Sequence, residues 1–132
     1  MPAPLPPAFR DLFRRKAFAH LATRMADGAP QVSPVWVDLD GDDVLVNTER
    51  ARLKLRNVLR DPRVALSIQD PENPYRYLEI RGRVVETTEH GAAGHIDRLA
   101  QRYMGVDRYP NNRPGDVRVI LRIRPERVHT MG

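Results

Sequence analysis

Apolar and polar residues alternate with a period of two along much of the chain, and this pattern predicts strands that bury one face. The strands that we expect lie at residues 17–24, 31–39, 44–48, 64–69, 75–86 and 117–122, with a seventh at 126–130. Helical spacing predicts three helices: a short one after Pro6 and Pro7, one that Thr48 caps and that ends near Arg60, and one at residues 90–103. Short strands with helices inserted between them predict an α+β fold, mainly antiparallel β, with six or seven strands in a barrel-like sheet and about three peripheral helices.

Particular residues refine these elements. Leu55, Val58 and Leu59 are expected to form the buried stripe of the second helix. Pro34 removes a backbone donor from the strand at 31–39, so this strand should lie at an edge or contain a bulge. Gly82 indicates a bulge in the long strand at 75–86.

Length and composition predict a single globular domain. The 132 residues suffice for one hydrophobic core and not for two, so we expect one domain over residues 1–132, of which the proline-rich residues 1–7 are flexible. No apolar run reaches the roughly 18–20 residues that cross a bilayer, and the N-terminus lacks the layout of a signal peptide. The absence of cysteine excludes a disulfide, a thiolate nucleophile and a cysteine-based metal site. A cytoplasmic location is therefore expected.

The net charge of +5 favours anionic partners, which include nucleic acids, membrane surfaces and phosphorylated small molecules. Only Lys16 and Lys54 among the 22 basic residues are lysines, so much of the arginine content, like the 12 prolines, is expected to reflect a bias in composition rather than a binding site. No basic cluster is interleaved with aromatic residues that could stack on bases. We therefore expect a small-molecule ligand, and neither nucleic acid nor a membrane.

The segment NTERARLKLRN at residues 47–57 is the first candidate site. A strand leads here into the N-terminus of a helix, where free N–H groups and the helix dipole favour an anion. Arg52 and Lys54 lie in the first turn, and Asn47 and Thr48 precede it with amide and hydroxyl donors. This arrangement predicts a phosphate site; the alternative is a capped surface helix with a solvated basic face.

The segment QVSPVW at residues 31–36 is the second candidate. The proline leaves backbone groups unpaired, and these could bind the polar edge of a flat heterocycle, with Trp36 packed near the ring. The alternative is a core tryptophan beside an edge-strand proline.

Tyr75 and Tyr77 are the third candidate. They share one face of a strand, where exposed tyrosines suit a subunit interface or the rim of a binding site. Ordinary cross-strand packing is the alternative.

An acid–base catalytic group is not evident in the sequence. The four histidines have no metal-binding spacing, no metal site is expected, and no Ser/His/Asp arrangement is readable. Hydride transfer by a flavin-type ring depends on positioning and a dry pocket more than on protein acid–base groups. The composition of the chain is thus compatible with a cofactor enzyme, and also with a protein that is no enzyme.

Residues 20–66, HLATRMADGAPQVSPVWVDLDGDDVLVNTERARLKLRNVLRDPRVAL, resemble the hallmark region of the pyridoxamine 5'-phosphate oxidase-like family. Within that family they are most similar to the branch that uses the deazaflavin coenzyme F420. The resemblance covers about a third of the chain. It implies a split β-barrel and a homodimer with two equivalent cofactor sites at its interface.

The resemblance also implies roles for the residues of the first candidate segment. Arg52 and Lys54 would bind the cofactor's phosphate, and Asn47 and Thr48 would lie close by, at the phosphate or the ribityl chain. Asn57 matches the asparagine of the family's helix, where it would either contact the cofactor or order the loop.

Further residues would surround the ring of the cofactor. Those that would line it, largely through backbone groups, are Gln31, Ser33, Pro34 and Val35. Tyr75 and Tyr77 would come from the partner subunit and border the ring or the substrate pocket.

The function that the resemblance implies is an F420-dependent oxidoreductase, a reductase that transfers a hydride between the reduced deazaflavin and a small electron-poor organic acceptor. The first alternative is an FMN-dependent oxidoreductase of the same family, since both cofactors carry a phosphate after a ribityl chain. The second is a non-catalytic protein that binds a cofactor or a tetrapyrrole. The chain lacks the C-terminal substrate-phosphate segment expected of true pyridoxamine-phosphate oxidases, so that activity is not predicted.

Overall fold

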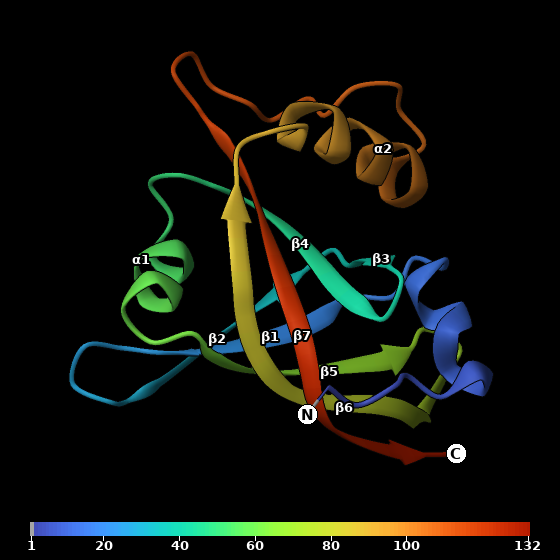
Figure 1. Ribbon diagram of the computed structural model, residues 1–132. Helices are drawn as coiled ribbons and strands as arrows, with labels where there is room; N and C mark the ends of the chain where they lie inside the picture. The colour runs from blue at the N-terminus through green and yellow to red at the C-terminus, as the bar shows by residue number, and fades with distance from the viewer. Residues whose placement is uncertain (1) are drawn as a thin grey trace.

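The computed structural model describes residues 2–132, which fold around one antiparallel sheet of seven strands in the order β2-β1-β5-β6-β7-β4-β3 (Figure 1). The elements in chain order are η1 (Pro7–Phe13), β1 (Ala19–Arg24), β2 (Pro30–Val35), β3 (Asp38–Asp40), β4 (Asp43–Glu49), α1 (Leu53–Arg60), β5 (Arg63–Asp70), β6 (Asn73–Thr88), α2 (Ala92–Met104) and β7 (Arg118–Met131). The predicted α+β class, the mainly antiparallel sheet and the three helices are confirmed, with η1 as a 3₁₀-helix.

The connection between β2 and β3 demonstrates that the sheet is rolled into a barrel. These two strands are the opposite edges of the sheet, yet only Trp36 and Val37 separate them in the chain. Two residues span at most about 10 Å with their flanking bonds, so the edges must lie near each other. They do not pair with each other, and the barrel is therefore split at this point.

One predicted element is wrong at this seam, the unpaired boundary between β2 and β3. The alternation at residues 31–39 predicts a single strand, but β2 ends at Val35 and β3 begins at Asp38. Val35 and Val37 still face the core, as the alternation indicates. The strand divides because its first half pairs with β1 and its second half with β4, at the other edge of the sheet.

The barrel interior is filled by the apolar face of each strand. Leu21, Leu66, Ile80 and Leu121 are nearly or fully buried, and each alternates with more exposed neighbours in its strand. Helix η1 adds Phe9, Leu12 and Phe13 to the same hydrophobic core. Burial of such side chains contributes about 1.5–3 kcal/mol each and is the main force that holds the barrel closed.

Strands β6 and β7 form the longest pairing in the sheet, and Gly82 permits it. A Cβ atom at Gly82 would lie 2.2 Å from the carbonyl oxygen of Arg124, so only glycine allows β7 to approach this closely. The pairing shifts register between Arg81 and Gly82, which confirms the predicted bulge. Gly82 pairs there with Pro125, and β7 runs on through this proline instead of ending. The strands predicted at 117–122 and 126–130 are accordingly one strand.

Helix α1 differs in two respects from the prediction. Thr48 belongs to β4, and the residue that precedes the first turn of α1 is Arg52, which makes no side-chain cap. A tight turn intervenes, in which the Arg52 N–H donates to the Glu49 carbonyl at 2.9 Å. Leu59 is 65% exposed, and Asn57 is buried in its place because it bonds to Thr23 of β1.

The N-terminal segment, for which flexibility is expected, contacts the barrel in the structure. Leu5 belongs to the hydrophobic core, and the Ala3 N–H donates to the Pro125 carbonyl at 2.8 Å. Met1, which the same expectation covers, lies outside the described residues. Within residues 2–132, none of the helices combines the length and apolarity of a membrane span.

Candidate functional site

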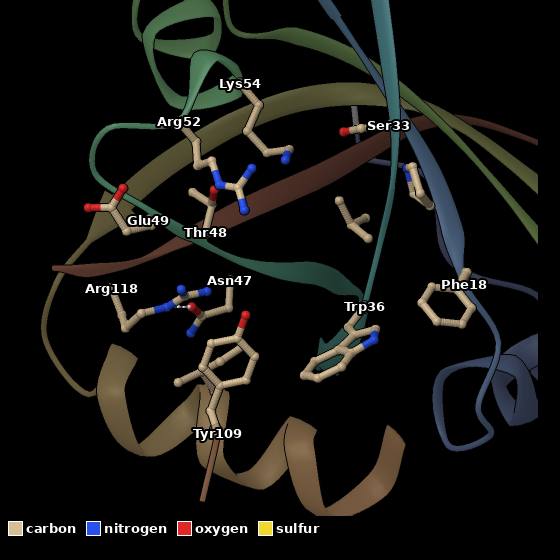
Figure 2. Close-up of a pocket in the computed structure, with 13 residues that line it drawn as sticks. Phe18, Ser33, Trp36, Asn47, Thr48, Glu49, Arg52, Lys54, Tyr109 and Arg118 are labelled. Atoms are coloured by element: carbon tan, nitrogen blue, oxygen red, sulfur yellow. Dashed lines mark hydrogen bonds between the residues drawn. The ribbon is translucent and has the colours of Figure 1, made fainter. Parts of the chain in front are cut away.

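A cavity of about 370 Å³ opens where β2, β4 and the first residues of α1 and β7 meet (Figure 2). Seven of the residues that the sequence suggests for cofactor binding line it: Ser33, Pro34, Val35, Asn47, Thr48, Arg52 and Lys54. Its other lining residues are Phe18, Trp36, Glu49, Ile96, Tyr109 and Arg118. The first and second candidate segments are 11 residues apart in sequence, from Trp36 to Asn47, and the fold brings them to one cavity.

One side of this cavity is cationic. Arg52 and Lys54 reach into it from the start of α1, and Arg118 enters from the start of β7 (Figure 2). Burial lowers the pKa of Lys54, and the neighbouring charges of Arg52 and Arg118 lower it further. Burial likewise lowers the pKa of Arg118. In the described part of the chain, none of these three cations forms a salt bridge, so they repel one another and favour an anion.

Glu49 is the carboxylate among the lining residues. Its Oε2 accepts a hydrogen bond from the Ala51 N–H at 2.8 Å, which stabilises the turn that leads into α1. This contact directs the carboxylate to the backbone rather than to Arg52. Glu49 therefore shapes the turn that presents the cations and forms no salt bridge with them among residues 2–132, although its charge attracts that of Arg118.

The other side of the cavity is aromatic. Trp36 stacks on Tyr103 with ring centroids 4.9 Å apart and planes 4° apart, and Tyr109 meets Trp36 edge-on at 5.8 Å. The Tyr103 hydroxyl donates to the Ala17 carbonyl at 2.7 Å and accepts from the Val37 N–H at 3.2 Å. Trp36 is thus held rigidly at the seam of the barrel, with Phe18 further along the same wall (Figure 2).

Ser33 carries a buried hydroxyl in this cavity that lacks a partner in the described part of the chain. Its Oγ is buried and has no hydrogen bond to any of residues 2–132. A buried hydroxyl without a partner costs about 1–3 kcal/mol, so such atoms mark places where a ligand or another chain supplies the bond. Ser33 lies on β2, an edge strand that pairs with β1 alone, so its backbone is also free on one side.

Gln31 and Asn57 do not line the cavity; the structure joins them to each other instead. Asn57 donates from Nδ2 to the Thr23 hydroxyl at 3.0 Å, and that hydroxyl donates to Gln31 Oε1 at 3.0 Å. Arg60 donates to Asn57 Oδ1 at 2.8 Å. Of the two roles considered for Asn57, this geometry corresponds to ordering, because the chain of bonds ties α1 to β1 and β2.

Tyr75 and Tyr77 also lie outside the cavity of this chain. Tyr75 is 78% exposed, and the Tyr77 ring lies 6.3 Å from that of His129 on the neighbouring strand β7. Their assignment to the site of a partner subunit stays a prediction.

Sequence reasoning missed five lining residues: Phe18, Glu49, Ile96, Tyr109 and Arg118. Arg118 could have been found, because it is a polar position at the start of an otherwise apolar strand pattern. Tyr109 lies in an irregular loop whose course has no periodic signal. Among residues 2–132, no three His, Asp or Glu side chains gather in a metal-binding group.

Comparison with known proteins places this architecture in a family. The family model described as pyridoxamine 5'-phosphate oxidase matches residues 5–132. A solved F420 reductase is 36% identical over 95% of this chain and 98% of its own, with a TM-score of 0.82. No curated protein matches the chain.

Two more distant structures share the fold. The conserved hypothetical protein Rv2991 from Mycobacterium tuberculosis is 20% identical over 98% of this chain and 86% of its own, with a TM-score of 0.75. HupZ of Group A Streptococcus is 22% identical over 96% and 93%, with a TM-score of 0.70. The family resemblance of residues 20–66 is therefore confirmed, and the chain belongs to the pyridoxamine 5'-phosphate oxidase family.

Proposed function

We propose that this protein is an F420-dependent oxidoreductase, a reductase that transfers a hydride from the reduced deazaflavin to a small electron-poor organic acceptor. The observation that carries the proposal is one cavity in which three cations, none of them in a salt bridge among residues 2–132, face an aromatic wall. The similarity to an F420 reductase at 36% identity supports the same conclusion.

The lining residues fit a ligand with an anionic group at one end and a flat, polar-edged ring at the other. Arg52 can bind a phosphate with two parallel hydrogen bonds, and Lys54 adds a compact charge beside it. The unpartnered Ser33 Oγ and the free edge of β2 offer hydrogen bonds to the polar edge of a ring. Pro34 keeps that edge open because it has no N–H to pair.

Asn47 has a narrower role than the resemblance implies. Both hydrogens of its side-chain amide are engaged, one by the Ala92 carbonyl at 2.9 Å and one by His95 Nδ1 at 3.1 Å. No donor is left for a phosphate, and only the second lone pair of Oδ1 is free to accept from a ligand hydroxyl. We therefore assign Asn47 to the ribityl side of the ligand.

The protein's contribution to the reaction is binding and positioning. When bound, the reduced deazaflavin supplies the hydride. Arg52 and Lys54 hold the anionic end of the ligand, and Ser33 and the backbone of β2 orient the ring end. Trp36 and Tyr109 keep water away from one side of the cavity, which favours hydride transfer over side reactions.

The protein is further inferred to act as a homodimer with the cofactor in the interface. Val32 on β2 is 62% exposed and Phe18 beside the cavity is 49% exposed, so an apolar surface adjoins the site. A second copy would cover it and could supply Tyr75 and Tyr77 to the opposite site. A cytoplasmic location, expected from the sequence, belongs to the same proposal.

Titration of the purified protein with oxidised F420 and, separately, with FMN tests the cofactor. We expect F420 to bind more tightly, and turnover of an acceptor panel with reduced F420. Tight FMN binding without F420 binding would favour the FMN-dependent alternative. Binding of either cofactor without turnover on any acceptor would favour a non-catalytic binding protein.

A further inference from the structure

Arg118 has the features of a third binding cation in the cavity. Its Nε donates to Asn47 Oδ1 at 2.9 Å, and its guanidinium carbon lies 5.1 Å from the centre of the Tyr109 ring. Both contacts leave the two terminal nitrogens without a protein hydrogen bond in the part of the chain that the structure describes. These nitrogens remain available for an anion in the cavity that Arg118 lines (Figure 2).

The orientation of the Asn47 amide follows from its partners. Arg118 can only donate, so the atom that faces it must be the oxygen Oδ1. The Ala92 carbonyl can only accept, so the atom that faces it must be the nitrogen Nδ2. Two independent partners therefore fix the amide in one orientation, and Nδ2 also points at His95 Nδ1 at 3.1 Å.

This orientation determines which nitrogen of His95 carries the proton. Because Asn47 Nδ2 is a donor, Nδ1 must accept and cannot carry a proton. The proton is then on Nε2, which donates to Asp38 Oδ2 at 3.1 Å. The His95 side chain is 2% exposed, so no water competes for either nitrogen.

Asp38 is a fixed acceptor at the end of this chain of bonds. Its Oδ1 accepts from Arg102 at 3.0 Å and from the Leu39 N–H at 2.9 Å. Arg102 is itself held by the Val37 carbonyl at 2.7 Å. The order of contacts is thus Arg102, Asp38, His95, Asn47, Arg118, and it runs from the last turn of α2 to the cavity.

In place of His95, an aliphatic side chain at this buried position of α2 would avoid the cost of burying a polar ring. The two hydrogen bonds of His95, to Asn47 and Asp38, therefore explain the histidine better than packing does. We propose that Arg118 binds the anionic group of the ligand as a third cation, and that His95 is a positioning residue that orients Arg118 through the amide of Asn47. This inference rests on the proposed function, because the anion in question is the phosphate of the cofactor.

A double-mutant cycle on the full-length protein tests both parts of this proposal, with the Kd for oxidised F420 as the readout. Arg118→Gln should weaken binding about tenfold or more, as loss of a charged hydrogen bond does. His95→Leu should weaken it about fivefold in the wild type. In the Arg118→Gln background the same change should have almost no effect on Kd, because the guanidinium that His95 orients is already absent.

Two further variants distinguish positioning from a merely structural role. His95→Asn keeps an acceptor for Asn47 Nδ2 and should restore most of the affinity that His95→Leu loses. Leu99→Ala removes a fully buried side chain of α2 that does not line the cavity, so it should lower Tm and leave Kd unchanged. Equal weakening by His95→Leu in both backgrounds, or an unchanged Kd in Arg118→Gln, would overturn the proposal.

The wild-type titrations separate this proposal from the proposed function. If the wild type binds FMN and not F420, the deazaflavin assignment fails and the same cycle is run with FMN. If it binds neither, both conclusions fail. If it binds F420 and the cycle shows no coupling, only the roles of Arg118 and His95 are wrong.

Discussion

The side-chain amide of Asn57 donates to the hydroxyl of Thr23 at 3.0 Å, and both residues are almost completely buried. Helix α1 is thereby fixed to strand β1 by a buried polar contact, beside a second hydrogen bond from Arg60 to the Arg24 carbonyl at 2.9 Å. Since Arg52 precedes α1 and Lys54 lies in its first turn, this contact also sets where the two cations lie relative to β2.

Replacement of Asn57 by alanine should destabilise the protein. It removes the hydrogen bond that Asn57 donates to the Thr23 hydroxyl and the one that it accepts from the Arg60 guanidinium, and we expect a loss of about 1–3 kcal/mol in the free energy of unfolding. Urea denaturation measures it. Leu59→Ala, at an exposed position of the same helix, is the control and should change stability by less than about 0.5 kcal/mol.

Replacement of Lys54 by alanine should weaken cofactor binding by about 1–3 kcal/mol, because a hydrogen bond to a charged group is lost. Isothermal titration calorimetry gives the affinity. Lys16 is the other lysine of the chain and does not line this cavity, so Lys16→Ala should bind as the wild type does. If Lys54→Ala and Arg52→Ala both retain wild-type affinity, the phosphate site is elsewhere.

Ser33→Ala should separate stability from binding. Without ligand, the variant loses a buried hydroxyl that has no partner, so its Tm should equal or exceed that of the wild type. With ligand, it should bind more weakly and gain less thermal stability from saturating cofactor. A lower Tm in the ligand-free variant would mean that the hydroxyl already has a partner in solution.

The ionised carboxylate of Asp38 should stabilise the folded protein at neutral pH, and this stabilisation should be lost in acid. Burial acts to raise the pKa of Asp38, but hydrogen bonds from His95, the Leu39 N–H and Arg102 outweigh it and hold the pKa at about 2. A carboxyl whose pKa is lowered on folding stabilises the protein above its unfolded pKa, 3.8, and loses this effect as the pH falls towards 2.

Asp38→Asn should therefore be less stable than the wild type at pH 7, by about 1–2 kcal/mol, because solvent screens part of the interaction of this half-buried carboxylate. The difference should shrink as the pH is lowered from about 4 to 2, because the wild-type carboxyl is then protonated. Urea denaturation of both proteins at pH 7 and pH 3 measures this, and a pH-independent difference would contradict the assignment.

Gly82→Ala should destabilise the barrel, because the added Cβ would lie 2.2 Å from a backbone oxygen of β7 that cannot move alone. Overpacking of this kind costs about 1–3 kcal/mol. Gly94 offers a matched control on α2, where an added Cβ meets only an ordinary contact of 3.5 Å with the Arg98 side chain. Gly94→Ala should stabilise the helix by about 0.5–1 kcal/mol. Thermal unfolding of the two variants tests the contrast.

Most of the sheet could be predicted from the sequence because its strands bury one face. Apolar and polar residues therefore alternate along each strand with a period of two. The bulge at Gly82 was visible for a similarly local reason, a glycine inside a strand pattern. The break between Val35 and Asp38 was not, because it depends on which distant strands the two halves pair with. No local pattern contains that information.

The site could be predicted in part. Arg52 and Lys54 were accessible because strand, turn and helix start are consecutive in the chain, whereas Arg118 and Tyr109 reach the cavity from more than 50 residues away. The buried stripe of α1 was misjudged at Leu59, since hydrophobicity alone ranks leucine above asparagine. A hydrogen bond to Thr23 reversed that order at Asn57.

The two-residue link through Trp36 and Val37 has a mechanical consequence. It joins the opposite edges of one sheet, so the two edges cannot separate further than this short link allows, and Trp36 of the cavity wall is one of its two residues. A ligand bound against Trp36 would contact the barrel at the point where its two edge strands, β2 and β3, do not pair. Occupancy of the site and slow hydrogen exchange along both β2 and β3 should therefore rise together, as a single cooperative unit.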